Sequence, residues 1–246
     1  MRLPNHGCTY HVKGLPMPTL RAQFVLFDGF DLLDVIAPFE VLSAGSAALG
    51  GVLECVLVSE SGRDSIPSGA AGVSLPASTA LEPEAPGYVI VPGASGPVDG
   101  DPDAGERTVP ALLGRFAGSP AMSLVARALA APQVTVVAVC GGGLALAMAG
   151  LLEGRTATTH HLGIDRLQSI GVNAVRARVV DDGDLVTGGG VLSGVDVALY
   201  LLERDFGCAA ARAVEDLFEF ERRGTTWKTS AGRLPRTPVT GQRVQA

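Results

Sequence analysis

Residues 133–151 read Gln-Val-Thr-Val-Val-Ala-Val-Cys-Gly-Gly-Gly-Leu-Ala-Leu-Ala-Met-Ala-Gly-Leu, and the other motifs of the chain can be placed around this stretch. Its first part, Val134–Val139, is apolar and rich in β-branched residues, which is typical of a strand buried on both faces. Three glycines follow Cys140, and the Ala- and Leu-rich segment Leu144–Leu152 is typical of a buried helix. The pattern therefore predicts a sharp strand-to-helix turn with Cys140 at its apex, although Gly-x-Ser-x-Gly itself is absent.

A cysteine at such a turn has two interpretations. Cysteine is among the most buried residue types, so Cys140 can be inert packing. Alternatively it lies at the carboxyl end of a parallel strand, where open α/β sheets bind ligands. The first N–H groups and the dipole of the following helix would then stabilise a thiolate and lower the pKa of the thiol. Position alone leaves both interpretations open.

Composition limits the classes of function. The chain has 246 residues, of which 47% are hydrophobic, and a formal net charge of −6, which argues against a nucleic-acid partner held on a broad basic face. We find no uncharged apolar run of about 18 residues, so we expect no membrane span. The first twenty residues lack the apolar core of a signal peptide. The four cysteines are scattered, which argues against a zinc or other metal site and favours a reduced, cytoplasmic protein.

Strands alternate with helices from residue 20 to residue 222, which predicts an α/β fold with a mostly parallel sheet and helices on both faces. We expect a flexible extension over residues 1–19, a single domain over 20–227 and a disordered basic tail over 228–246. The expected strands are Leu20–Phe27, Val52–Ser59, Tyr88–Val91, Ala174–Val180 and Asp184–Thr187. The expected helices are Val109–Ala130 with a break near Gly118, Leu162–Ile170, Val195–Phe206 and Ala209–Arg222.

Asp34 follows the first expected strand and an Asp-Gly turn signal at Asp28-Gly29. Apolar residues then recur at helical spacing, and Pro38 fits the first turn of a helix. Asp34 is either a helix-capping aspartate or a partly desolvated carboxyl group with a raised pKa, suited to proton transfer. Its position alone favours the cap.

Three further turns surround the expected site. A Pro-Gly turn at Pro92–Gly96 either presents backbone N–H groups to an anion or is an ordinary turn. His160 and His161 either pair with Cys140 or bond to the backbone of their own turn. The glycine-rich segment Thr187–Asp196 opens the next helix; it lacks the lysine of a phosphate loop and is interpreted as a second wall of the cysteine pocket.

Together these motifs resemble the ThiJ/PfpI superfamily, whose fold is a flavodoxin-like, class I glutamine amidotransferase-like three-layer sandwich. The resemblance covers roughly residues 20–222 and is nearest to isonitrile (isocyanide) hydratases and to the ligand domains of amidotransferase-like AraC regulators. The matching stretches are Leu-Phe-Asp-Gly-Phe-Asp-Leu-Leu-Asp-Val-Ile-Ala-Pro (26–38), Ile-Val-Pro-Gly (90–93), the segment 139–160 around Cys140, and Asp-Gly-Asp-Leu-Val-Thr-Gly-Gly-Gly-Val-Leu-Ser-Gly-Val-Asp (182–196).

The resemblance implies that Cys140 is a nucleophile with Asp34 as its partner acid, which reverses the preference for a cap. It also implies that the N–H groups of Gly141 and Ala94 face a bound anion. From the turns described above, we expect Gly93, His160, His161 and Val191 to complete the substrate site. Three positions depart from the hydratase pattern: Gly141 replaces a threonine, Ala94 a glycine and His161 a tryptophan.

By this resemblance the chain is a cysteine-dependent hydratase that adds water to an isonitrile through a Cys140 thioimidate and releases an N-substituted formamide. It would need no cofactor or metal, act on a small molecule and form a homodimer. Two alternatives are a glyoxalase- or deglycase-type enzyme acting on reactive carbonyls, and a non-catalytic ligand-binding or regulatory protein.

Overall fold

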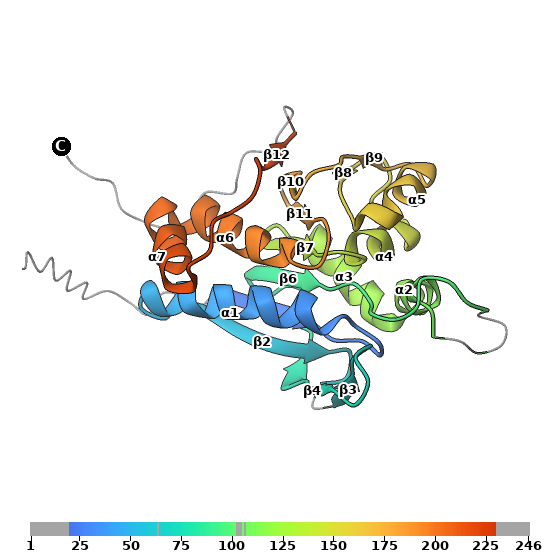
Figure 1. The fold of residues 1–246 in the computed structure, drawn as a ribbon. Coiled ribbons are helices and arrows are strands. Elements are labelled where there is room, and N and C mark those ends of the chain that lie inside the picture. The colour runs from blue at the N-terminus through green and yellow to red at the C-terminus, as the bar shows by residue number, and fades with distance from the viewer. Residues whose placement is uncertain (1–19, 63, 102–104, 106, 230–246) are drawn as a thin grey trace, which may run out of the picture.

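An eight-stranded sheet runs through the computed structural model in the order β12-β10-β11-β7-β6-β1-β2-β5 (Figure 1). The structure describes residues 20–62, 64–101, 105 and 107–229. The strands of this sheet are β1 (Leu20–Val25), β2 (Leu53–Ser59), β5 (Thr79–Ala80), β6 (Gly87–Val91), β7 (Val134–Ala138), β10 (Val179–Asp181), β11 (Leu185–Gly188) and β12 (Trp227–Lys228). Two small sheets pair β3 (Ser65–Pro67) with β4 (Ser74–Pro76) and β8 (Thr156–Ala157) with β9 (Asn173–Ala174).

Helices cover both faces of the large sheet, which confirms the predicted three-layer α/β fold (Figure 1). One layer contains α1 (Leu32–Ala48), α6 (Ser193–Phe206) and α7 (Cys208–Phe218), which pack against one another. The other contains α2 (Val109–Ala117), α3 (Pro120–Ala130), α4 (Gly142–Met148), the 3₁₀ turn η2 (His161–Gly163) and α5 (Ile164–Ser169). No single helix within the described residues could cross a membrane; α2 and α3 reach the required length and composition only as a pair, bent by 66° at their break.

The neighbouring strands β1, β6, β7 and β11 run parallel, so their carboxyl ends meet at one edge of the sheet. The only antiparallel pair among the described strands of this sheet is β10 with β11, which are joined by the expected Asp182-Gly183 turn. The chain leaves β1, β6 and β7 at this edge through the turns that carry Asp34, Gly93 and Cys140. Topology thus brings together segments that are far apart in sequence.

The apolar runs of the central strands form the core. Phe24, Val89, Val136 and Val186, one from each of the four parallel strands, are completely inaccessible to solvent. Such complete burial on a central strand requires cover on both sheet faces, and it explains the continuous apolar runs in the sequence.

The sequence predicts Pro38 in the first turn of a helix. In the structure it lies in the interior of the 17-residue helix α1. Proline lacks an N–H, so α1 forfeits the bond that position 38 would make to the Asp34 carbonyl. Apolar packing accounts for the ring at this place: a Cβ built on Gly194 of α6 would lie 3.1 Å from its Cδ.

Two other predicted elements differ from those observed. The expected strand Ala174–Val180 is divided, because Asn173–Ala174 pairs with β8 whereas Val179–Asp181 joins the large sheet. Helix α7 ends at Phe218, four residues earlier than predicted, because Glu219 adopts a left-handed conformation with φ of +48°.

The expected boundary at residue 228 falls inside an element. Lys228 belongs to β12, which pairs with β10, and Thr229 donates its N–H to the Asp181 carbonyl over 3.2 Å. The predicted extension over residues 1–19 and the tail from residue 230 onward lie outside the described residues.

Candidate active site

Cys140 lies between the end of β7 and the start of α4, at the predicted strand-to-helix turn. Its φ of +54° is in the left-handed region, which a residue with a side chain seldom adopts. This conformation costs on the order of 1–3 kcal/mol and persists only where its surroundings enforce it. The helix begins at Gly142, two residues before the predicted Leu144. The side chain is almost buried, with 6% of the residue exposed.

Two separate loops hold the backbone of Cys140. Its N–H donates to the Gly188 carbonyl at the end of β11 over 3.2 Å. Its carbonyl accepts a hydrogen bond from the Thr159 hydroxyl at 2.7 Å and a longer one from the His160 N–H at 3.3 Å. These three bonds fix both peptide groups of the strained residue.

Asp34 lies in the first turn of α1 and is completely buried. It is not the helix cap, because Asp31 caps α1 by accepting from the Leu33 N–H over 2.9 Å. One Asp34 oxygen, Oδ2, accepts from the Gly93 N–H over 2.9 Å. The other, Oδ1, is a buried polar atom with no hydrogen-bond partner in the described part of the chain. An unpartnered buried oxygen is uncommon in proteins and marks this carboxyl group as a candidate for chemistry.

The pKa of Asp34 is raised to about 8, first by burial and then by the negative charge of Asp31. The Gly93 N–H and the Cys140 side chain oppose this shift without cancelling it. At neutral pH Asp34 is therefore a carboxylic acid. Because Oδ2 already accepts from an N–H, the proton is best placed on Oδ1.

The pKa of the Cys140 thiol is raised, in contrast to the lowered pKa that its interpretation as an activated nucleophile implies. Burial raises its pKa, the neighbouring Asp34 carboxylate raises it further, and the Gly141 N–H lowers it by less than these effects combined. Helix α4 has only seven residues, and its amino end does not offset desolvation of the thiolate. Cys140 and Asp34 thus form a buried pair that holds its protons at neutral pH.

Glycines allow three backbone segments to converge on this pair. A Cβ on Gly93 would lie 2.6 Å from the Gly141 nitrogen and 2.9 Å from Asp34 Oδ2. A side chain at position 141 would meet Leu113, whose Cδ1 lies 3.0 Å from the Cβ position. Ala94 is buried opposite Phe30 in a bridge that uses the N–H groups of Asp31 and Ser95. Gly93 and Gly141 therefore lie directly at the pair, and Ala94 follows Gly93.

The histidines do not bond to the Cys140 sulfur in the described structure. His160 is half-buried, and its Nδ1 accepts from the Leu162 N–H at 3.3 Å, as expected for a turn histidine bonded to the backbone. Burial and the neighbouring His161 lower the pKa of His160. His161 is exposed, with its ring centroid 4.4 Å from that of His160. Val191 is half-buried in the β11–α6 turn, which approaches the His160 ring through Gly190.

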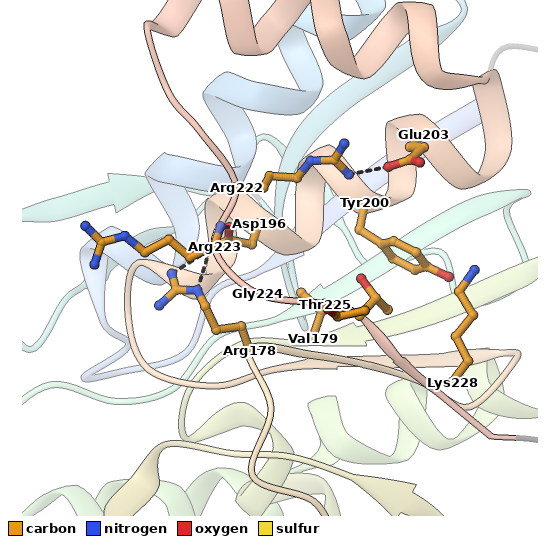
Figure 2. A pocket seen from close by; sticks show the side chains of 11 residues that line it. Arg178, Val179, Asp196, Tyr200, Glu203, Arg222, Arg223, Gly224, Thr225 and Lys228 are labelled. Carbon is orange, nitrogen blue, oxygen red and sulfur yellow. Dashed lines mark hydrogen bonds and ion pairs between the residues drawn. The ribbon is translucent and has the colours of Figure 1, made fainter.

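Two cavities elsewhere in the molecule do not contain Cys140 or Asp34. The first, of about 320 Å³, lies under the segment that follows α7 (Figure 2). Two of its half-buried cations are paired, Arg178 with Asp196 and Arg222 with Glu203, and Arg223 points away from Tyr200. The second, of about 640 Å³, lies beside Trp227. Among the residues that the structure describes, no group of three or more His, Cys, Asp or Glu side chains is arranged to hold a metal ion.

Sequence reasoning missed the residues that hold the site in place. Asp31 lies immediately before the helix and is of a residue type that caps helices, so its sequence position contains the signal for the cap. Thr159 stands beside the histidines, and the sequence contains no sign that its hydroxyl bonds to the Cys140 carbonyl. Gly188 contributes only a backbone oxygen, which no side-chain pattern reveals.

Comparison with known proteins places this site in a family. The DJ-1/PfpI family model matches residues 112–204, which include Cys140. The chain is 33% identical over 206 residues to an isonitrile hydratase of Pseudomonas putida, with 82% of this chain and 78% of that protein covered.

Solved structures agree on the fold. A ThiJ/PfpI family protein from Pseudomonas syringae has a TM-score of 0.66 at 22% identity, covering 89% of this chain and 85% of that one. Drosophila melanogaster DJ-1beta has a TM-score of 0.64 at 18% identity, covering 83% and 100% respectively. The extent and identity of the match to the hydratase, together with the family model and the shared fold, show that this chain belongs to the DJ-1/PfpI family.

Proposed function

We propose that this protein is a cysteine-dependent hydratase that converts an isonitrile into an N-substituted formamide. The observation that carries the proposal is the pairing of Cys140, in a left-handed turn, with Asp34, a buried carboxylic acid whose Oδ1 has no polar hydrogen-bond partner among the described residues and whose pKa the Cys140 side chain influences. The similarity to the isonitrile hydratase of Pseudomonas putida supports the choice of substrate class.

The first step uses both members of the pair. The Cys140 sulfur bonds to the terminal carbon of R–N≡C while Asp34 delivers its proton to that carbon, and the proton of the thiol replaces it on the carboxyl group. The product is a thioimidate, R–N=CH–S–Cys140. A protonated Asp34 suits this role, since the carbon of an isonitrile becomes basic as the sulfur attacks.

The second step consumes one water. Water adds to the thioimidate carbon, the nitrogen gains a proton, and the carbon–sulfur bond breaks. Asp34, protonated at the end of the first step, gives its proton to the imine nitrogen and takes one from the attacking water as the oxygen adds to the carbon. When the carbon–sulfur bond breaks, Asp34 gives this proton to the sulfur and takes the proton of the new hydroxyl, so that the carbonyl forms. The sum is R–N≡C + H₂O → R–NH–CHO, with the enzyme restored. Neither step requires oxidation or reduction. The Gly141 N–H, which already interacts with the sulfur, stabilises negative charge that develops beside it.

The departure at position 141 leaves a backbone donor in place. Gly141 has no hydroxyl to offer, but its backbone N–H is retained. Leu113 lies where a side chain at position 141 would extend, so this part of the wall is apolar. We infer that the site favours an isonitrile with an apolar substituent.

The test is direct product analysis. Wild-type protein is incubated with cyclohexyl isonitrile, and formation of N-cyclohexylformamide is followed by liquid chromatography with mass detection. We expect turnover by the wild type, with loss of at least about 1,000-fold in Cys140→Ser and Asp34→Asn. Retained turnover in Cys140→Ser would refute the thioimidate route. If the wild type converted methylglyoxal but formed no formamide from the isonitrile, the hydratase assignment would be refuted. The result would favour a glyoxalase- or deglycase-type enzyme.

A further inference from the structure

Among the described residues, the Thr159 hydroxyl is the only side-chain group that bonds to the backbone of Cys140. Thr159 is 2% exposed, and its Oγ1 lies 2.7 Å from the Cys140 carbonyl oxygen. The second donor to that oxygen, the His160 N–H, lies farther away at 3.3 Å. The bond from the Thr159 hydroxyl is therefore the shorter of the two hydrogen bonds that the Cys140 carbonyl accepts. Cys140 lies outside helix α4, so these two bonds hold its carbonyl in direction.

The Cys140 carbonyl and the Gly141 N–H belong to one peptide group. A peptide group is planar, so a bond that fixes the direction of the carbonyl also fixes the direction of the N–H at its opposite side. That N–H lowers the pKa of the Cys140 thiol, as a donor near the sulfur does. A hydrogen bond accepted by the carbonyl also polarises the peptide and strengthens the N–H as a donor.

We propose that Thr159 is a positioning residue, which holds the 140–141 peptide plane and so aims the Gly141 N–H at the sulfur and at charge developing on a bound substrate. The inference rests on the proposed role of Cys140 as nucleophile, and it assigns Thr159 a part in that role through the backbone. Thr159 itself does not touch the reacting atoms.

A neighbouring threonine provides a matched control. Thr158 is also buried, at 1% exposed, and its hydroxyl donates to the Ala177 carbonyl over 3.3 Å instead of to Cys140. Thr158→Val and Thr159→Val remove the same group from adjacent positions of one loop. A general loosening of the loop would affect both variants, whereas loss of the peptide restraint would affect only Thr159→Val. Thr159→Ser keeps the hydroxyl and should retain the effect.

The experiment measures the thiol and the amide separately from catalysis. In a protein with Cys8, Cys55 and Cys208 replaced by serine, Cys140 alkylation by iodoacetamide is followed from pH 6 to pH 11. We expect Thr159→Val to slow alkylation at pH 8 about tenfold, which corresponds to one pKa unit. Thr158→Val and Thr159→Ser should stay within about twofold of the parent protein. Amide-resolved hydrogen exchange should become faster at Gly141 in Thr159→Val alone.

Equal pH profiles and equal Gly141 exchange in Thr159→Val and the parent protein would overturn the proposal and leave the hydratase assignment intact. Equal effects of Thr158→Val and Thr159→Val would also overturn it, because they would indicate loop packing. If Thr159→Val fails to fold, Thr159→Ala removes the same hydroxyl with less bulk. Both measurements are made without an isonitrile, so failure of the proposed function would appear only in the formamide assay.

Discussion

At the scale of single residues, the central feature is a carboxyl group whose folded environment favours its neutral form. The pKa of Asp34 rises from an ordinary 3.8 to about 8. Between about pH 4 and pH 8 the folded state therefore binds more protons than the unfolded state, and stability falls as pH rises through this window. The ionised form is present to a large extent only above about pH 8.

Asp34→Asn should accordingly stabilise the protein in a pH-dependent manner. Asparagine keeps the acceptor for the Gly93 N–H but cannot ionise. We expect the free energy of unfolding to increase by at least about 2 kcal/mol at pH 8, with little change at pH 4, as measured by urea denaturation. Asp28→Asn is the control of opposite sign, because Arg107 lowers the pKa of Asp28. That variant should lose up to about 1 kcal/mol above pH 4, since the pair is half-exposed. A pH-independent effect of Asp34→Asn would contradict the raised pKa.

At the scale of elements, the site depends on a close approach between α4 and the loop after β6. A Cβ on Gly142 would lie 2.3 Å from the Val91 carbonyl oxygen and 3.0 Å from that of Pro92. Both are backbone atoms and cannot yield as a side chain would. The glycine run after Cys140 thus serves the packing of a helix onto a neighbouring strand end.

Gly142→Ala should destabilise the protein by about 2–4 kcal/mol and reduce formamide production. Gly114→Ala is the matched control, because Gly114 lies inside α2 and its nearest neighbour is the flexible end of Met148, 3.4 Å away. Alanine is the better helix former, so that variant should gain about 0.5–1 kcal/mol. Thermal unfolding monitored by circular dichroism measures both changes. If Gly142→Ala left the stability unchanged, the close contact between position 142 and the Val91 and Pro92 carbonyls would not restrict the side chain at this position.

Local features of the fold could be predicted from the sequence, whereas contacts between distant residues could not. Apolar runs revealed β1, β6 and β7, and the glycines after Cys140 revealed the turn, because these are local signals. The bond from the Gly93 N–H to Asp34 joins residues 59 positions apart, and no local pattern encodes it. Asp34 was distinguished from a cap by its family resemblance, whereas the structure does so by placing Asp31 in the capping position. The interpretation of Cys140 as an activated thiol implies a lowered pKa, whereas in the folded protein burial and a nearby carboxylate oppose the helix dipole and raise the pKa.

At the scale of the whole molecule, the segment after α7 returns to the large sheet as β12. Trp227 pairs in register with Val180, and Arg222 forms ion pairs with Glu203 of α6 and Glu215 of α7. The backbone N–H of Arg223 donates to the buried Asp196 over 3.1 Å (Figure 2 shows Arg222, Arg223, Asp196 and Glu203). Sequence periodicity could not predict this return, because two paired residues are too few to produce a pattern.

The chain contains one tryptophan, which reports on this segment specifically. If β12 belongs to the same cooperative unit as the sheet, Trp227 fluorescence and far-UV circular dichroism should give coincident urea transitions, with midpoints within about 0.2 M of each other. An earlier fluorescence transition would show that the segment detaches before the domain unfolds.

The most direct test of the account is a titration of the Cys140 thiolate by its absorbance at 240 nm, in protein with Cys8, Cys55 and Cys208 replaced by serine. Parent protein is compared with Asp34→Asn, and Cys140→Ser provides the baseline. We expect a thiol pKa above the free value of about 8.5, and a lower pKa in Asp34→Asn, since the carboxylate beside the sulfur is then absent. A thiol pKa below 8.5, or one that Asp34→Asn leaves unchanged, would contradict the coupled, proton-holding pair on which the proposed hydratase chemistry depends.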